Sequence, residues 1–184
     1  HTLRVGVLHE KMFLNIVDSA YRTPPNSYIT LSDFKGNTDI IRPYTQWQYR
    51  ATNGLTFNVG VHYNHFLLNN SWNAEPRAGV RYQVNPINSI SFGYGLHSQL
   101  QPMQVYFSKV KTLQGTDVEP NKNLDFTRSH HLVLGYDRLL SEFMRVKLET
   151  YYQRIFNAPV DVRPGPYSML NQGADFGIDA PDSM

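Results

Sequence analysis

Apolar and polar residues alternate with a period of two along most of the chain, and helical periodicity is nearly absent. In residues 55–64 one face carries Leu55, Phe57, Val59, Val61 and Tyr63, and the other carries Thr56, Asn58, Gly60, His62 and Asn64. The same alternation predicts seven strands, over residues 2–17, 44–50, 55–66, 77–84, 89–97, 128–137 and 144–154. The pattern therefore predicts an all-β protein.

The predicted connections alternate in length. Long polar segments occupy residues 18–39, 68–76, 98–125 and 157–184, whereas short turns separate the strands in between. Up-and-down outer-membrane barrels have short turns on one side, long loops on the other, and strands of about ten residues. We therefore expect an antiparallel up-and-down meander that forms part of a transmembrane β-barrel. A soluble or surface-attached sheet whose apolar face is a core remains an alternative.

Composition narrows the functional classes. Aromatic residues make up 13% of the chain and charged residues only 17%, below the usual quarter. The net charge of +2 does not argue for nucleic-acid binding, and the absence of Cys excludes disulfides and thiolate metal sites. No apolar run approaches the length of about 20 residues that a transmembrane helix needs.

Three histidines, His62, His97 and His131, fall on the polar face of different strands. Imidazoles facing a wet lumen are able to bind a metal chelate or an anionic ligand. An ordinary lining of a wet lumen is the favoured interpretation of the three histidines. No carboxylate completes a ligand set, so we predict no metal site.

Other candidates for ligand contact are cationic or aromatic. Arg77 and Arg81 contribute to a basic bias of the polar face, which would attract an anionic solute. Trp72 lies in a predicted external loop, as do three further aromatic residues: Tyr28, Phe34 and Tyr167. Exposed aromatic rings there would stack on a ligand such as a sugar, or pack against neighbouring loops.

Catalysis has little support in the sequence. Ser129 and His131 share one strand face about 7 Å apart, while His130 points the other way. No acidic residue is placed to orient a Ser–His pair, so an outer-membrane hydrolase is disfavoured. We predict no catalytic residue and no cofactor.

The residues EPRAGVRYQVNPINSISFGYGLHSQLQPMQVYF (75–107) resemble the barrel of a TonB-dependent outer-membrane receptor. The group that they most resemble is the Bacteroidetes type, which carries a carboxypeptidase-regulatory-like domain ahead of its plug. The stretches SHHLVLGYD (129–137) and RVKLETYYQRIFNAPV (145–160) are similar to the strands that follow in that group. SMLNQGADFG (168–177) resembles the extracellular segment before the next strand.

The resemblance implies uptake of a scarce nutrient across the bacterial outer membrane, without catalysis. It implies outer-membrane lipid, a plug domain and the TonB complex as partners, with a small nutrient, glycan or peptide as ligand. It also makes plug contact the favoured role for the polar-face charges, ahead of attraction of an anionic solute. About seven strands are too few for the roughly 22 of plugged transporters. We therefore expect residues 1–184 to be a partial barrel domain without plug or TonB-contacting segment. The rival function is a soluble β-sheet binding module, perhaps for carbohydrate.

Overall fold

The computed structural model describes residues 1–24, 26–112, 114–172 and 184. Its strands and helices, in chain order, are β1 (Thr2–Arg22), β2 (Ser27–Arg50), β3 (Leu55–Phe66), β4 (Ser71–Asn85), β5 (Asn88–Gln99), α1 (Met103–Tyr106), β6 (Val110–Lys111), β7 (Asp117–Val118), β8 (Thr127–Ser141), β9 (Met144–Phe156) and α2 (Met169–Gln172). Residues 173–177 of the predicted extracellular segment lie outside the described residues.

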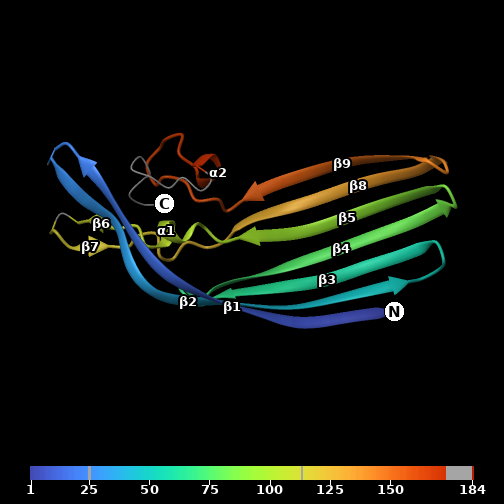
Figure 1. Cartoon of the computed structure of the whole chain (residues 1–184), viewed down its shortest axis with the longest axis horizontal. Coiled ribbons are helices and arrows are strands. Elements are labelled where there is room, and N and C mark those ends of the chain that lie inside the picture. The colour runs from blue at the N-terminus through green and yellow to red at the C-terminus, as the bar shows by residue number, and fades with distance from the viewer. Residues whose placement is uncertain (25, 113, 173–183) are drawn as a thin grey trace.

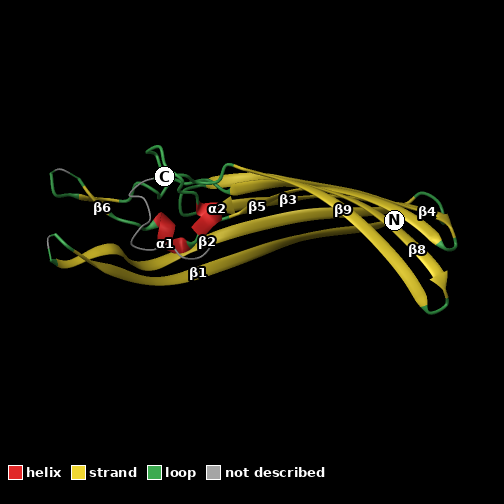
Figure 2. Cartoon of the chain, turned by 90° about the horizontal axis from the view of Figure 1, so that it is seen from above, coloured by secondary structure: helices red, strands yellow, loops and turns green. Residues whose placement is uncertain are grey.

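Seven of the strands form one antiparallel sheet in the order β1-β2-β3-β4-β5-β8-β9. Each strand pairs with its sequence neighbour in this sheet, apart from the excursion between β5 and β8. The sheet is strongly curved and forms a half-barrel (Figures 1 and 2). The predicted all-β meander and barrel section are thus confirmed.

Residues 18–39 are not the loop that the sequence predicts. They continue β1 and β2 into a long hairpin, paired down to Arg22↔Ser27, with a register shift at Asp18/Ser19. The hairpin projects beyond the other strands of the seven-stranded sheet (Figure 1). Its inward positions mix Ser32, Phe34 and Thr38, so the alternation that marks a strand is weak there, although the backbone ladder is continuous.

The predicted polar loop at residues 68–76 is also mostly strand. Only residues 67–70 separate β3 from β4, and Asn70 takes a positive φ of 56° in that turn. β4 therefore begins at Ser71 rather than near Arg77. The short turns at 51–54, 86–87 and 142–143 agree with the prediction and lie together at the opposite end of the sheet (Figure 1).

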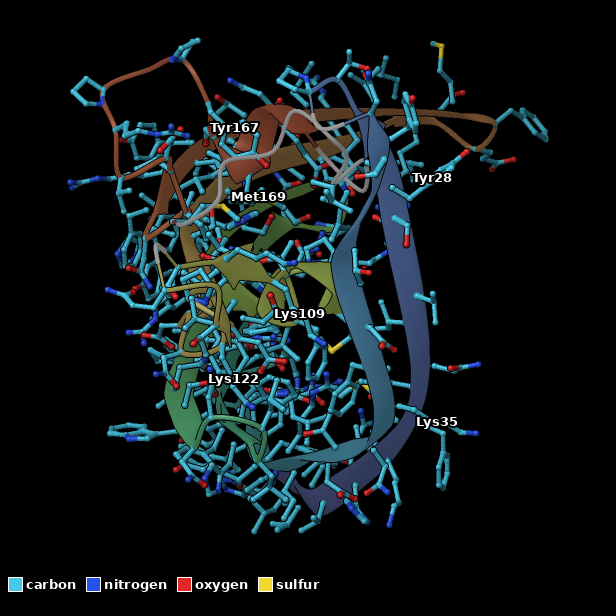
Figure 3. All side chains as sticks on the ribbon, turned by 90° about the vertical axis from the view of Figure 1, so that its left-hand side faces the viewer. Tyr28, Lys35, Lys109, Lys122, Tyr167 and Met169 are labelled. Carbon is cyan, nitrogen blue, oxygen red and sulfur yellow. The ribbon has the colours of Figure 1, made fainter. Side chains whose placement is uncertain are left out.

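Residues 100–126 fold into the concave side of the sheet. Ile40 and Phe66 from the sheet form a buried core with Tyr106, Phe107 and Phe126 from this excursion. The Phe34 and Phe107 rings stack with their centroids 3.7 Å apart. Seen from this end, Lys109 and Lys122 lie within the curve of the sheet, and Lys35 lies on the outer side of β2 (Figure 3).

Hydrogen bonds fix this excursion to several strands and turns. Asn69 Nδ2 donates to the Leu124 carbonyl at 2.9 Å, and Lys109 N donates to the Leu31 carbonyl at 2.7 Å. The Tyr106 hydroxyl accepts a bond from Gln101 N at 3.3 Å, and burial raises the pKa of Tyr106 to about 12. The core therefore lies at the loop end of the sheet.

The convex face is apolar and bare. Val59 is 48% exposed and Leu134 is 51% exposed, although both belong to well-paired strands. No second layer of described residues covers this face (Figure 2). A soluble sheet would bury it in a core, whereas a barrel wall presents it to lipid.

Candidate functional site

The strand register brings the polar positions of four strands together on the concave face. His62 lies opposite Glu75, and Arg77 lies opposite Gly95. Gly95 is in turn opposite His131, and His97 is opposite Ser129. His62, Arg77, His97 and His131 thus belong to one cluster, which we call the inward polar cluster. Arg81 lies on the same face, two inward positions further along β4.

Glu75 is the buried centre of this cluster, with 5% of its surface exposed. Its carboxylate accepts bonds from Arg77 Nη2 at 2.8 Å, Asn64 Nδ2 at 3.0 Å and Ser98 N at 2.9 Å, and also from the Ser98 hydroxyl. A buried carboxylate needs several donors of this kind because it has lost its hydration. Glu75 could not be predicted from strand parity, because the sequence pattern places residues 68–76 in a loop and β4 instead begins at Ser71.

Ser98 could not be found by parity, because alternation along β5 places it on the outward side. The recorded β4–β5 register ends at Arg77↔Gly95. Beyond that pair the Glu75 carboxylate accepts the Ser98 N–H in place of a strand carbonyl. Asn73 Nδ2 also donates to Ser98 Oγ at 2.8 Å, so side-chain hydrogen bonds connect the two strands beyond their backbone pairing.

Two of the three histidines touch each other. The His97 and His131 rings meet edge to face, with centroids 4.7 Å apart. A Cβ on Gly95 would come within 2.6 Å of His97 Nε2, so the absence of a side chain lets the imidazole lie along the strand. His62 instead stacks on Tyr44, with centroids 5.3 Å apart.

Charges nearer the short-turn end are paired on the strands themselves. Arg145 bonds Asp137, and Lys147 Nζ lies 2.7 Å from Glu149 Oε1. Arg81 Nη2 donates to Ser89 Oγ at 3.4 Å. Half-exposed ion pairs of this kind suit a wet surface.

Trp72 lies apart from the inward polar cluster. Its predicted position in a loop is wrong, because it belongs to a strand. It belongs to β4, opposite His65, where even-numbered residues face outward, and it is 59% exposed. Its ring stacks on Tyr63 with centroids 5.8 Å apart. Aromatic residues at this level of a barrel form the interfacial girdle.

The other three predicted loop aromatics have different surroundings. Phe34 and Tyr28 lie in β2, and Phe34 is packed against Phe107. Tyr28 remains 76% exposed and touches the edge of Tyr21. Tyr167 lies in the C-terminal segment and donates its hydroxyl to Met169 Sδ at 3.5 Å; burial raises the pKa of Tyr167.

The described residues offer no assembled catalytic or metal site. Ser129 Oγ has no hydrogen-bond partner in the ranges that the structure describes, and the His130 ring lies 3.0 Å from the Tyr94 hydroxyl on the outward side. No group of three His, Cys, Asp or Glu side chains in the described part of the chain is able to hold a metal ion. The inward polar cluster presents imidazole and guanidinium groups on the concave face.

No helix among the described residues has both the length and the apolar character needed to cross a membrane. No curated protein and no solved structure matches the chain significantly. The family model of the TonB dependent receptor-like β-barrel matches residues 3–177. This family consists of outer-membrane receptors that work in transport rather than catalysis, together with a plug domain and TonB. The curved meander and its two-faced strands agree with this match. The chain therefore belongs to the TonB-dependent receptor β-barrel family.

Proposed function

We propose that residues 1–184 form part of the wall and the outer mouth of a receptor that takes up a scarce nutrient across the outer membrane. The observation that carries this proposal is the contrast between the two faces of one sheet. Leu134 is bare on the convex side, while Glu75 is buried among donors on the concave side. Lipid outside and a wet lumen inside satisfy both faces at once.

The open edges of the sheet support a larger barrel. β1 and β9 are the terminal strands of the seven-stranded sheet. Unpaired strand edges cannot face hydrocarbon, because each free N–H and C=O would lack a partner. We therefore propose that further strands of a parent polypeptide pair with these edges. The same parent supplies the plug and the TonB-contacting segment, and belongs to the Bacteroidetes type.

The inward residues are the proposed contacts for the ligand or the plug. His62, His97, His131, Arg77 and Arg81 face the space that a closed barrel would enclose. Trp72 faces away from that space, so we assign it to the membrane interface.

Two neighbouring aliphatic residues provide a direct test. Val133 faces inward and Leu134 faces outward on β8, and the chain contains no Cys. Single Val133→Cys and Leu134→Cys variants of the parent receptor, reconstituted in lipid, would carry an environment-sensitive fluorophore. We expect nitroxide-labelled lipid to quench the label at position 134, and aqueous iodide to quench the label at position 133.

The rival module gives a different result. In a soluble sheet protein, Leu134 would be covered by a protein core, so neither quencher would reach position 134. The protein would also fold and stay in solution without detergent. That outcome would overturn the receptor proposal and favour a soluble binding module.

A further inference from the structure

A groove lies on the concave side of β2, β3 and β4, next to the inward polar cluster. Its volume is about 410 Å³, within the range of small-molecule sites. Its lining consists of Gln46, Asn58, Val59, Gly60, His62, Arg77, Ala78 and Gly79. Gly60 and Gly79 are the inward positions of its floor, so backbone rather than side chains forms the bottom.

Among the described residues that line the groove, which include no lysine or carboxylate, Arg77 is the one arginine. One of its terminal nitrogens, Nη2, is bound to Glu75, whereas Nε is buried and has no partner among the described residues. The guanidinium side chain is still 40% exposed. Because Nε is buried, a ligand in the groove would bind the exposed part of the guanidinium instead, where a charged N–H donor is available to an incoming acceptor.

Glu75 does not cancel this cation completely. The Glu75 side chain is 7% exposed, and its carboxylate also accepts hydrogen bonds from Asn64 and Ser98, which stabilise part of the negative charge. It lies outside the groove lining, so a bound group would meet Arg77 first. The nearby negative charge still disfavours a doubly charged anion, because like charges repel.

The rest of the lining suits one small acid. Gln46, Asn58 and His62 offer neutral amide and imidazole groups, and Tyr44 holds the imidazole by stacking on it. An arginine fork matches the two oxygens of a carboxylate better than it matches a neutral hydroxyl. A sugar ring or an amino-acid backbone would fill the remaining volume above the glycines.

The geometry points to a binding site for a carboxylate-bearing group of sugar or amino-acid size, with Arg77 as its anchor. This inference depends on the proposed function, which places the groove inside a barrel. The carboxylate comes from a solute in transit or from an acidic side chain of the plug. Both sources present the same chemistry to Arg77.

The test uses the detergent-solubilised parent receptor and D-glucuronate, with D-glucose as the neutral counterpart. We expect glucuronate to bind and glucose to bind at least tenfold more weakly in ligand-observed NMR titrations. Arg77→Gln should weaken glucuronate binding about tenfold, the loss expected for one charge-assisted hydrogen bond. Lys147→Gln is the matched control, because it removes the same charge from the same face outside the groove.

Gly79→Val tests the shape of the site without touching its charge. A Cβ at Gly79 meets only the Phe92 carbonyl oxygen at 3.6 Å, so the branch point of valine fits the sheet, and valine is a residue that strands favour. We expect Gly79→Val to abolish glucuronate binding as well.

The second arm identifies the plug as the source. If the plug occupies the groove, glucuronate will not bind the wild type, and Arg77→Gln and Gly79→Val will increase hydrogen exchange in the plug while Lys147→Gln will not. Absence of both effects would overturn the inference. Because the quenching test at positions 133 and 134 is independent, failure here would leave the receptor proposal standing.

Discussion

His97 and His131 meet edge to face, with ring centroids 4.7 Å apart, although they come from strands separated by the whole 100–126 excursion. The contact exists because β5 pairs directly with β8, which places Gly95 opposite His131. Gly95 leaves room for the His97 ring, which turns toward its neighbour.

This contact predicts a coupling between positions 95 and 97. Gly95→Ala should lower the free energy of unfolding of the parent receptor by at most about 1 kcal/mol, because the new Cβ displaces only the far end of the flexible His97 side chain from its contact with His131. In a His97→Ala background the same change should cost almost nothing. Thermal unfolding of the four variants of this double-mutant cycle measures the coupling, and additive effects would contradict it.

At position 75, the free energy of unfolding should depend on the hydrogen-bond acceptor atoms of Glu75 more than on its charge alone. Glu75→Ala leaves Arg77, Asn64 and Ser98 without their shared acceptor and should cost about 3–5 kcal/mol. Glu75→Gln keeps one acceptor oxygen and should cost clearly less. Denaturant unfolding compares the two variants, and equal losses would show that charge dominates.

The excursion should loosen when its aromatic core is opened. Phe107→Ala removes a buried ring that stacks on Phe34, a change that typically costs about 3–5 kcal/mol. Trypsin should then cut after Lys109 or Lys111 much faster than in the wild type. Phe143→Ala is the control, since Phe143 lies in a turn and is 96% exposed. Unchanged cleavage in Phe107→Ala would contradict the packing.

Tyr106 should make the outer mouth sensitive to strong alkali. Its pKa is raised from 10.0 to about 12, so the phenol is neutral in both states below pH 10 and its stabilisation is fully present there. Between pH 10 and 12 the unfolded chain ionises first, and this stabilisation is lost as pH rises. The phenolate absorbance that distinguishes the wild type from Tyr106→Phe should titrate near pH 12. A midpoint near 10 would contradict the burial.

Trp72 should report on lipid rather than on ligand. The Trp72 fluorescence is the difference between the emission of the wild type and that of Trp72→Phe. Nitroxide lipids labelled near the headgroup should quench this fluorescence, because Trp72 stacks on Tyr63 on the outward face. Trp72→Ala should leave glucuronate binding unchanged. Quenching by aqueous iodide alone would place Trp72 in a water-exposed loop instead.

The sequence by itself determined which residues face each side of the sheet. In 55–63 and 89–97 the apolar and polar positions alternate without interruption, and the observed registers keep that division. Side chains alternate along a regular strand, so a period of two is a local property of the sequence. The inward placement of His62, His97 and His131 follows from this rule alone.

Only the tertiary structure decided which inward residues touch and where the strands end. The 100–126 excursion packs on three apolar residues on the inward side of β1, namely Met12, Leu14 and Ile16. The local sequence pattern does not predict this contact. Likewise Ser98 reaches Glu75 only because β4 and β5 separate beyond Arg77. Pairing and packing depend on residues far apart in the chain, so they are settled when the sheet curves and its excursion folds inside it.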